Sequence, residues 1–113
     1  RNSCGSLIGF TVKGHAGYDD AGRDIICSAA SVIAYTVAGY FDDKFNRGCL
    51  DENCCFNAES GNFSLNRPRI ADDKEKIGAD AVMEAALIGF KQIEYSYGKK
   101  YLVVSEEEVQ SNA

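Results

Sequence analysis

The chain has 113 residues, of which 45% are hydrophobic and one is proline, and it carries a formal net charge of −5. This composition is typical of a globular protein and excludes a Pro-rich linker. The negative charge disfavours nucleic-acid binding, which needs a basic surface against the phosphates. The sequence has no apolar run of about 18 residues, so it predicts no membrane span. We expect a single cytoplasmic domain over residues 1–113.

A strand and a glycine-rich loop open the chain. Residues 7–13 place Ile8, Phe10 and Val12 on one face and smaller or polar residues on the other. This alternation predicts a half-buried strand. Residues 14–23 contain three glycines and predict a mobile loop.

A first helix is predicted to follow the loop. Asp24 is a candidate N-cap, which makes Cys27 the third helical residue. The inner stripe is expected to contain Ile26, Ala30, Ile33 and Val37, with Ala29 and Tyr40 beside it. Because the segment is apolar nearly all round, we expect the helix to be buried.

The second half predicts a hairpin, a helix and a strand. Residues 53–59 and 63–69 flank Ser-Gly-Asn, and Pro68 favours an edge position for the second strand. A helix is expected from Asp72 or Asp73 to Gly98, with Asp72 and Glu75 at capping-box separation. Residues 100–104 are expected to form a final strand. The expected inner face of the second helix comprises Ala79, Val82, Met83, Ala86, Phe90 and Ile93.

The predicted element order is strand, helix, strand, strand, helix, strand. Two helices covering one face of a mainly antiparallel sheet is the simplest packing of these elements. The fold class is therefore α+β.

Five cysteines, Cys4, Cys27, Cys49, Cys54 and Cys55, make an odd set with one vicinal pair. Such a set does not indicate a disulfide framework. The chain has no C-x-x-C motif and a single histidine, so we expect no metal site. We expect reduced and mostly buried thiols.

The stretch GHAGYDDAGRDIICSAAS contains His15 and Cys27. A cysteine in the first turn of a helix lies among free backbone N–H groups, which favour its thiolate and can also hold an oxyanion. An imidazole within hydrogen-bond reach can take the thiol proton and return it to a leaving amine. The same two residues are equally compatible with a small buried thiol and an ordinary loop histidine, so the spacing alone leaves both interpretations open.

The stretch closely resembles the signature of the bacterial ribosomal-processing cysteine protease family, called Prp. That signature runs Gly-His-Ala, a glycine-containing loop, and then Asp-Ile-Val-Cys-Ala-Ala-x-Ser. The matching residues here are Gly14, His15, Ala16, Gly22, Asp24, Ile25, Cys27, Ala29 and Ser31. Ile26 replaces Val, and Ser28 replaces the Ala that usually follows the cysteine. We expect the family's usual short opening strand to be missing or replaced upstream of RNSCG.

The resemblance implies a cysteine endopeptidase that needs no cofactor. Cys27 would be the nucleophile and His15 the general base. The expected substrate is the N-terminal extension of the large-subunit ribosomal protein numbered twenty-seven, cut after two phenylalanines during ribosome assembly. The resemblance also implies a cytoplasmic homodimer.

The other matched positions have supporting roles. Asp24 is expected to cap the helix rather than to join the catalytic pair. Ser31 can donate a hydrogen bond to a backbone carbonyl or help to position the site, and Gly14 and Gly22 are expected to let the loop open over a peptide.

Three alternative functions follow from the same residues. One is a non-catalytic, ribosome-associated peptide-binding module. A second is a thiol redox sensor in which Cys49 or Cys54 resolves an oxidised Cys27. A third is a metal-binding protein with Cys4, His15, Cys49 and Cys54 as ligands.

Overall fold

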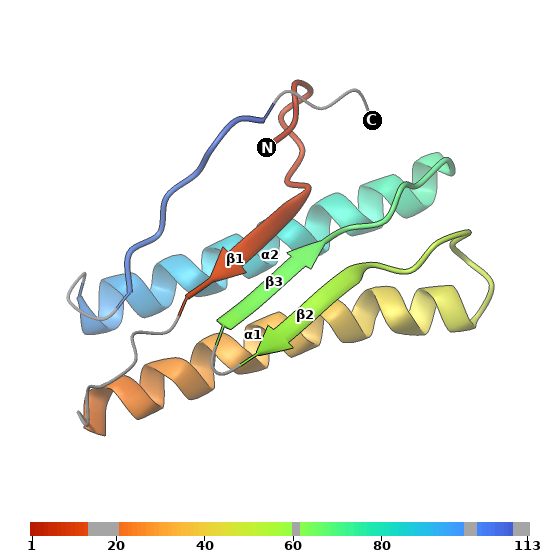
Figure 1. The fold of residues 1–113 in the computed structure, drawn as a ribbon. Helices are drawn as coiled ribbons and strands as arrows, with labels where there is room; N and C mark the ends of the chain where they lie inside the picture. Colours follow the sequence, from red (N-terminus) through yellow and green to blue (C-terminus); the bar gives the residue numbers. More distant parts are fainter. Residues whose placement is uncertain (14–20, 60–61, 99–101, 110–113) are drawn as a thin grey trace.

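The computed structural model describes residues 1–13, 21–59, 62–98 and 102–109. For residues 21–25 it describes the backbone and not the side chains. The described residues form three strands and two long helices (Figure 1). In chain order the elements are β1 (Gly9–Val12), α1 (Ala21–Asn46), β2 (Cys55–Glu59), β3 (Asn62–Asn66) and α2 (Asp73–Tyr97).

The three strands form an antiparallel sheet in the order β1-β3-β2. Leu65 of β3 lies opposite Phe10 of β1 and Phe56 of β2, so these three side chains share one face. Glu59 pairs with Asn62, which confirms the β2–β3 hairpin. The expected edge position of the second hairpin strand is wrong, because β3 is central and Pro68 lies beyond its end, where it removes no ladder hydrogen bond.

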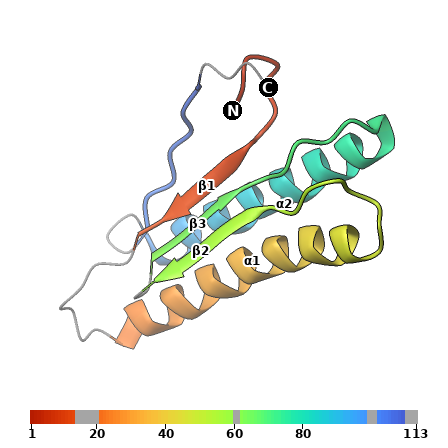
Figure 2. The ribbon, with the colours of Figure 1, turned by 45° about the vertical axis from the view of Figure 1, so that its right-hand side comes forward.

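Both helices lie on the same side of the sheet, as the turned view shows (Figure 2). The core between the layers contains Leu65 from β3, Phe41 from α1 and Met83 from α2, all nearly inaccessible to solvent. Phe10 also reaches α2, where its ring meets Phe90 edge-on at 5.3 Å between centroids. This arrangement confirms the predicted α+β class, with two helices on one face of an antiparallel sheet.

The start of α1 differs from the prediction. The helix begins at Ala21, so Asp24 lies inside it and does not precede it as an N-cap. Residues 21–23, which were expected to belong to the loop, extend the helix by about one turn. Cys27 therefore lies about a turn further from the helix start than its sequence context predicted.

The boundaries of α2 agree with the prediction. The Asp72 side chain accepts hydrogen bonds from the backbone N–H groups of Lys74 and Glu75, at 2.8 and 3.1 Å. Gly98 ends the helix with φ 87°, a conformation that favours glycine. The expected inner face is also confirmed, since five of its six residues are buried and Val82 is partly buried against the same core.

Small residues let the two helices approach closely. A Cβ placed on Gly78 would lie 2.7 Å from the hydroxyl oxygen of Tyr40, and one on Gly89 would lie 2.9 Å from Cδ1 of Ile33. These glycines therefore accept side chains of α1 directly against the backbone of α2.

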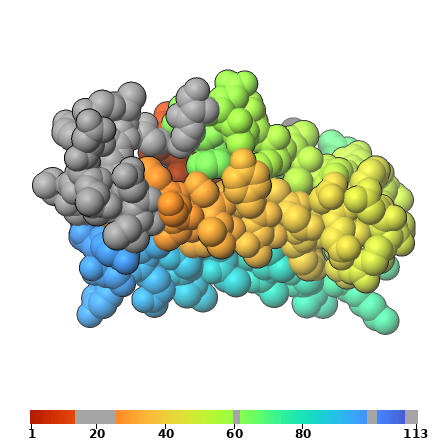
Figure 3. Space-filling view, turned by 90° about the horizontal axis from the view of Figure 1, so that it is seen from below, coloured from red at the N-terminus to blue at the C-terminus, as the bar shows by residue number. Residues whose placement is uncertain are grey.

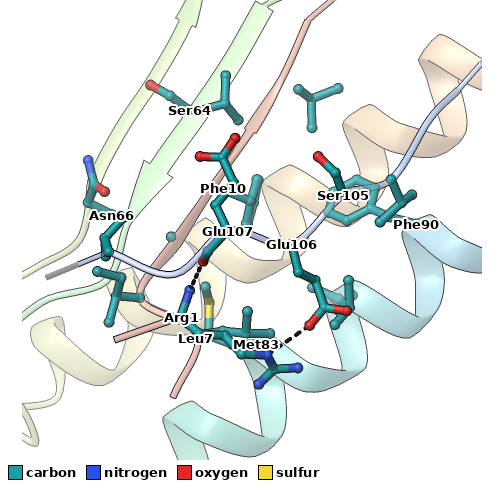
Figure 4. Close-up of a pocket in the computed structure, with 18 of the residues that line it drawn as sticks. Arg1, Leu7, Phe10, Ser64, Asn66, Met83, Phe90, Ser105, Glu106 and Glu107 are labelled. Carbon is teal, nitrogen blue, oxygen red and sulfur yellow. Dashed lines mark hydrogen bonds and ion pairs between the residues drawn. The ribbon is translucent and has the colours of Figure 1, made fainter. Parts of the chain in front are cut away.

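The predicted final strand is absent from the described residues. Lys100 and Tyr101 lie outside them, and residues 102–104 belong to no sheet. Leu102 and Val104 nevertheless pack against the core while Val103 is exposed, as in a strand. A groove of about 700 Å³ separates this segment from β1, which explains why no ladder forms between them (Figure 4).

Candidate active site

Cys27 lies on the outward face of α1. Ile26 and Ala30 point into the core, with 3% and 2% of their surface exposed. At 100° per residue, this orientation turns Cys27 and Ser28 away from the core, and both are exposed. Packing of the helix therefore presents the expected nucleophile to solvent, as a protease that acts on a peptide requires.

Cys27 lies further from the N-terminus of α1 than the sequence predicted. The N–H groups without helical partners are those of the first four residues, and Cys27 is the seventh residue of the helix. Its own amide is internal to the helix and is not available to hold an oxyanion. Because the helix dipole acts mainly within the first turn, activation of this thiol depends more strongly on a neighbouring base.

Ser31 is one turn beyond Cys27 on the same face. Its hydroxyl donates a 2.6 Å hydrogen bond to the backbone carbonyl of Cys27. Thr36 donates an equivalent bond to the carbonyl of Val32. Such bonds are common for hydroxyl side chains within helices, and the hydroxyl of Ser31 is directed at the backbone in this structure.

The remaining expected site residues are not described with their side chains. His15 and Gly14 lie outside the described residues, and for Gly22 and Asp24 the structure gives only their place within α1. The end of β1 and the start of α1 lie at the same end of the molecule (Figure 1).

The other thiols differ from the prediction that most would be buried. Cys4, Cys27, Cys49 and Cys55 are exposed, Cys54 is half-buried, and all five are free. Burial raises the pKa of the Cys54 thiol above its ordinary value, which disfavours its thiolate. Among the described residues, no group of three His, Cys, Asp or Glu side chains is placed to hold a metal ion.

The groove beside β1 lies apart from Cys27. Its walls come from β1, the inner face of α2 and the segment 102–109, and contacts of Arg1 with Glu106 and Glu107 cross it at one end (Figure 4). The described residues that line it include none of the expected site residues. We therefore place the candidate active site on α1 and not in this groove.

Sequence reasoning missed an aromatic cluster beside the candidate site. Tyr35 of α1 meets Phe56 of β2 and Phe63 of β3, with ring centroids 5.2 and 5.7 Å away. Despite these contacts, Tyr35 is 56% exposed. The sequence signal was Tyr35, which has small or aliphatic residues on both sides in a segment that we assigned to a buried helix.

Residues 1–102 match the profile of a family of cysteine peptidases. The chain belongs to this family, which is described as cysteine protease Prp, and it is therefore a cysteine protease. Among curated proteins, none matches the chain significantly.

Solved structures share the fold at low sequence identity. SMU.848 from Streptococcus mutans is 17% identical with a TM-score of 0.70, and the match covers 96% of this chain and 90% of that one. The ribosomal processing protease Prp from S. aureus in complex with a substrate peptide is 21% identical, with a TM-score of 0.63 over 85% and 84% of the two chains. The S. aureus Prp with a covalently linked product peptide is 20% identical, with a TM-score of 0.68 over 94% and 92%.

No helix among the described segments has the length and apolar character needed to cross a membrane.

Proposed function

We propose that this protein removes the N-terminal extension of the large-subunit ribosomal protein numbered twenty-seven during ribosome assembly, with Cys27 as nucleophile and His15 as general base. The observation that carries the proposal is the exposed Cys27 on the outer face of α1, in a chain of the Prp family. The S. aureus relative is described as a ribosomal processing protease, which supports the same substrate class here.

The chemistry follows from a thiol and an imidazole. His15 takes the proton of Cys27, and the thiolate sulfur attacks the carbonyl carbon of the scissile bond. The imidazolium then protonates the departing amine, which leaves an acyl group on sulfur. Water attacks this thioester with His15 again as the base, and the thiol and the peptide acid are released. The covalently linked product peptide described for the S. aureus enzyme fits such a covalent route.

The supporting assignments belong to the same proposal. Asp24 now lies within α1, one turn before Cys27 by helical spacing, so we assign it a role near the thiol instead of a cap. The glycines Gly14 and Gly22 let the intervening segment admit a peptide. We further propose a cytoplasmic homodimer built from one catalytic domain over residues 1–113, with no cofactor and no nucleic-acid partner.

Peptide cleavage tests the proposal. The probe is a lysine-flanked peptide that copies the extension and contains two adjacent phenylalanines. We expect one cut, after the second phenylalanine, detected by mass spectrometry. Replacing either phenylalanine with alanine should slow cleavage strongly, since each ring buries roughly 150–250 Å². Higher salt should weaken capture modestly, because the net charge of −5 attracts the lysines.

Two controls make the outcome clear. Cys27→Ala protein should give no cut, which excludes a contaminating protease. If wild-type protein cuts both alanine peptides at the parent rate, or cuts no peptide at all, the substrate assignment is wrong.

A further inference from the structure

The outer face of α1 continues from Cys27 without any charged residue. The next charges along the chain are Asp24 on one side and Asp42 on the other. Tyr35 lies eight residues beyond Cys27, and Val32 is its neighbour three residues before it on the helix surface; Val32 and Tyr35 are 65% and 56% exposed. The part of α1 drawn in orange occupies the middle of one face of the molecule (Figure 3). An extended chain can therefore lie along α1 without burying a charge.

Tyr35 is the exposed member of an aromatic platform, which we define as Tyr35, Phe56 and Phe63. Phe56 and Phe63 stack with their centroids 6.3 Å apart and their planes 16° apart. Both meet the Tyr35 ring edge-on, at interplanar angles of 70° and 76°. Strands β2 and β3 thus hold Tyr35 in place while much of its surface faces solvent.

The exposed apolar residues of α2 have a different setting. Ile77, Ile88 and Tyr95 each have a charged side chain three or four residues away, on the same helical surface. Single exposed apolar residues among charges are ordinary on protein surfaces. The platform on α1 is distinguished by the uncharged surface around it and by its continuity with Cys27.

Distance along the helix sets which part of a peptide can reach the platform. Tyr35 is eight residues beyond Cys27, which at a rise of about 1.5 Å per residue is about 12 Å along the axis. An extended peptide advances about 3.3 Å per residue. A peptide with its scissile bond at Cys27 therefore places a side chain about three or four residues away over Tyr35.

We propose that the aromatic platform is a specificity subsite that binds an apolar side chain of the substrate about three or four residues from the cleaved bond. This inference rests on the proposed function of Cys27 as the protease nucleophile. It names Tyr35 as a binding residue that determines which peptides are accepted.

A leucine scan tests the subsite through binding as well as cleavage. The probes are short fluorescein-labelled peptides with two adjacent phenylalanines, flanking lysines and one leucine, which is moved one position at a time on either side of the cleaved bond. Binding is measured by fluorescence anisotropy with Cys27→Ser protein, and cleavage by mass spectrometry with Cys27 intact. We expect the lowest Kd when the leucine lies about three or four residues from the bond. Tyr35→Ala should raise that Kd about tenfold.

Matched variants separate binding from folding. Tyr35→Phe keeps the ring and should keep the Kd, and Val32→Ser removes neighbouring apolar surface without touching a described ring contact. Tyr95→Ala removes a tyrosine that is 88% exposed on α2, and it should change neither the Kd nor the cleavage rate. Thermal unfolding shows whether each variant keeps its fold, and the iodoacetamide reactivity of Cys27 adds a second check for the variants that retain this thiol.

Each outcome decides a different statement. If Tyr35→Ala weakens every peptide equally, including one with serine in place of leucine, the platform is not a subsite. If Tyr35→Ala instead converts a dimer to a monomer in sedimentation, a second copy covers the platform and the inference is wrong. Position-dependent binding without cleavage would contradict the proposed function and support the subsite. A cleavage rate that Tyr35→Ala leaves unchanged would support the proposed function and contradict the subsite.

Discussion

The two helices have nearly equal lengths and bury similar inner faces, but their outer faces differ. α2 is capped at both ends and has charged residues along its exposed side. α1 carries an exposed thiol, small hydroxyl residues and Tyr35 on a side without charge between Asp24 and Asp42. Both helices therefore build the core, and α1 also offers a surface on which a peptide can bind and react. Changes on the outer face of α1 should affect activity, whereas changes within α2 should affect stability.

The largest effect is expected from removing the nucleophile. Cys27→Ala should abolish peptide cleavage, because no other thiol lies on the outer face of α1. Since the Cys27 side chain is exposed, its removal should leave the unfolding temperature nearly unchanged. A cleavage assay and a thermal melt of the same preparation check both parts. Residual cleavage by pure Cys27→Ala protein would remove Cys27 from the mechanism.

A smaller loss is expected from His15→Ala. A general base contributes on the order of 10²–10⁴-fold to the rate, and α1 provides little activation of its own because Cys27 lies beyond the first turn. The rate constant for cleavage under saturating peptide measures this loss. If the variant kept more than about a tenth of the wild-type rate, His15 would not be the base.

The contrasting change in α2 is Phe90→Ala. Phe90 is 7% exposed and packs edge-on against Phe10, so its loss leaves a cavity between α2 and the sheet. We expect a decrease of about 3–5 kcal/mol in the free energy of unfolding, measured by urea denaturation. Tyr95→Ala on the same helix is the matched control and should be nearly neutral. Equal stability of the two variants would show that α2 does not bury the face described here.

A still smaller effect is expected at the start of α2. Asp72→Ala removes the side-chain acceptor for the amides of Lys74 and Glu75, and should cost about 1 kcal/mol of unfolding free energy. Asp72→Asn restores the acceptor and should recover most of that loss. By contrast, Asp24→Ala should leave stability nearly unchanged, because Asp24 lies inside α1 and is not a cap. A loss of stability in Asp24→Ala equal to that in Asp72→Ala would contradict the observed start of α1.

The smallest expected effect is a response of the segment 102–109 to acid. Glu106 accepts hydrogen bonds from Arg1 and Lys91. These bonds lower the pKa of Glu106 below its ordinary value, and the bond from Arg1 has the larger effect. The lowered pKa means that these contacts stabilise the segment above the ordinary carboxyl pKa and are lost as the pH falls through the lower, folded value. Amide chemical shifts near Glu106 should follow this titration, and Glu106→Gln should abolish it. An unchanged acid response in Glu106→Gln would assign the effect to another carboxylate.

Local signals explain why α2 was predictable. The cap, the inner face and the glycine stop all lie within the helix or next to it, so sequence spacing was enough to place them. The start of α1 had no equivalent signal. Residues 21–23 are compatible with either a loop or a helix, and the acidic residue that follows them looked like a cap.

Non-local structure explains the other differences. Residues 102–104 have the alternation of a strand, but a strand also needs a neighbour, and the groove beside β1 separates them from one. The exposure of Tyr35 and of Cys27 depends on which side of α1 meets the sheet. The periodicity correctly predicted Ile26, Ala30 and Val37 as inner residues, but because the segment is apolar nearly all round the sequence predicted a buried helix and not an exposed outer side. The predicted element order gave the α+β class, and the family signature predicted Cys27 as the nucleophile. The aromatic platform became visible only when β2 and β3 were placed.

Competitive alkylation of the five thiols shows whether Cys27 is an activated cysteine. Four of the thiols are exposed, so exposure alone cannot make Cys27 the fastest to react. With limiting iodoacetamide at neutral pH, we expect Cys27 to be labelled first in the wild-type protein and to lose this preference in His15→Ala. Labelling of Cys4, Cys49 or Cys55 at the same rate, or a Cys27 rate that does not change in His15→Ala, would contradict the assignment of an activated cysteine on the outer face of α1.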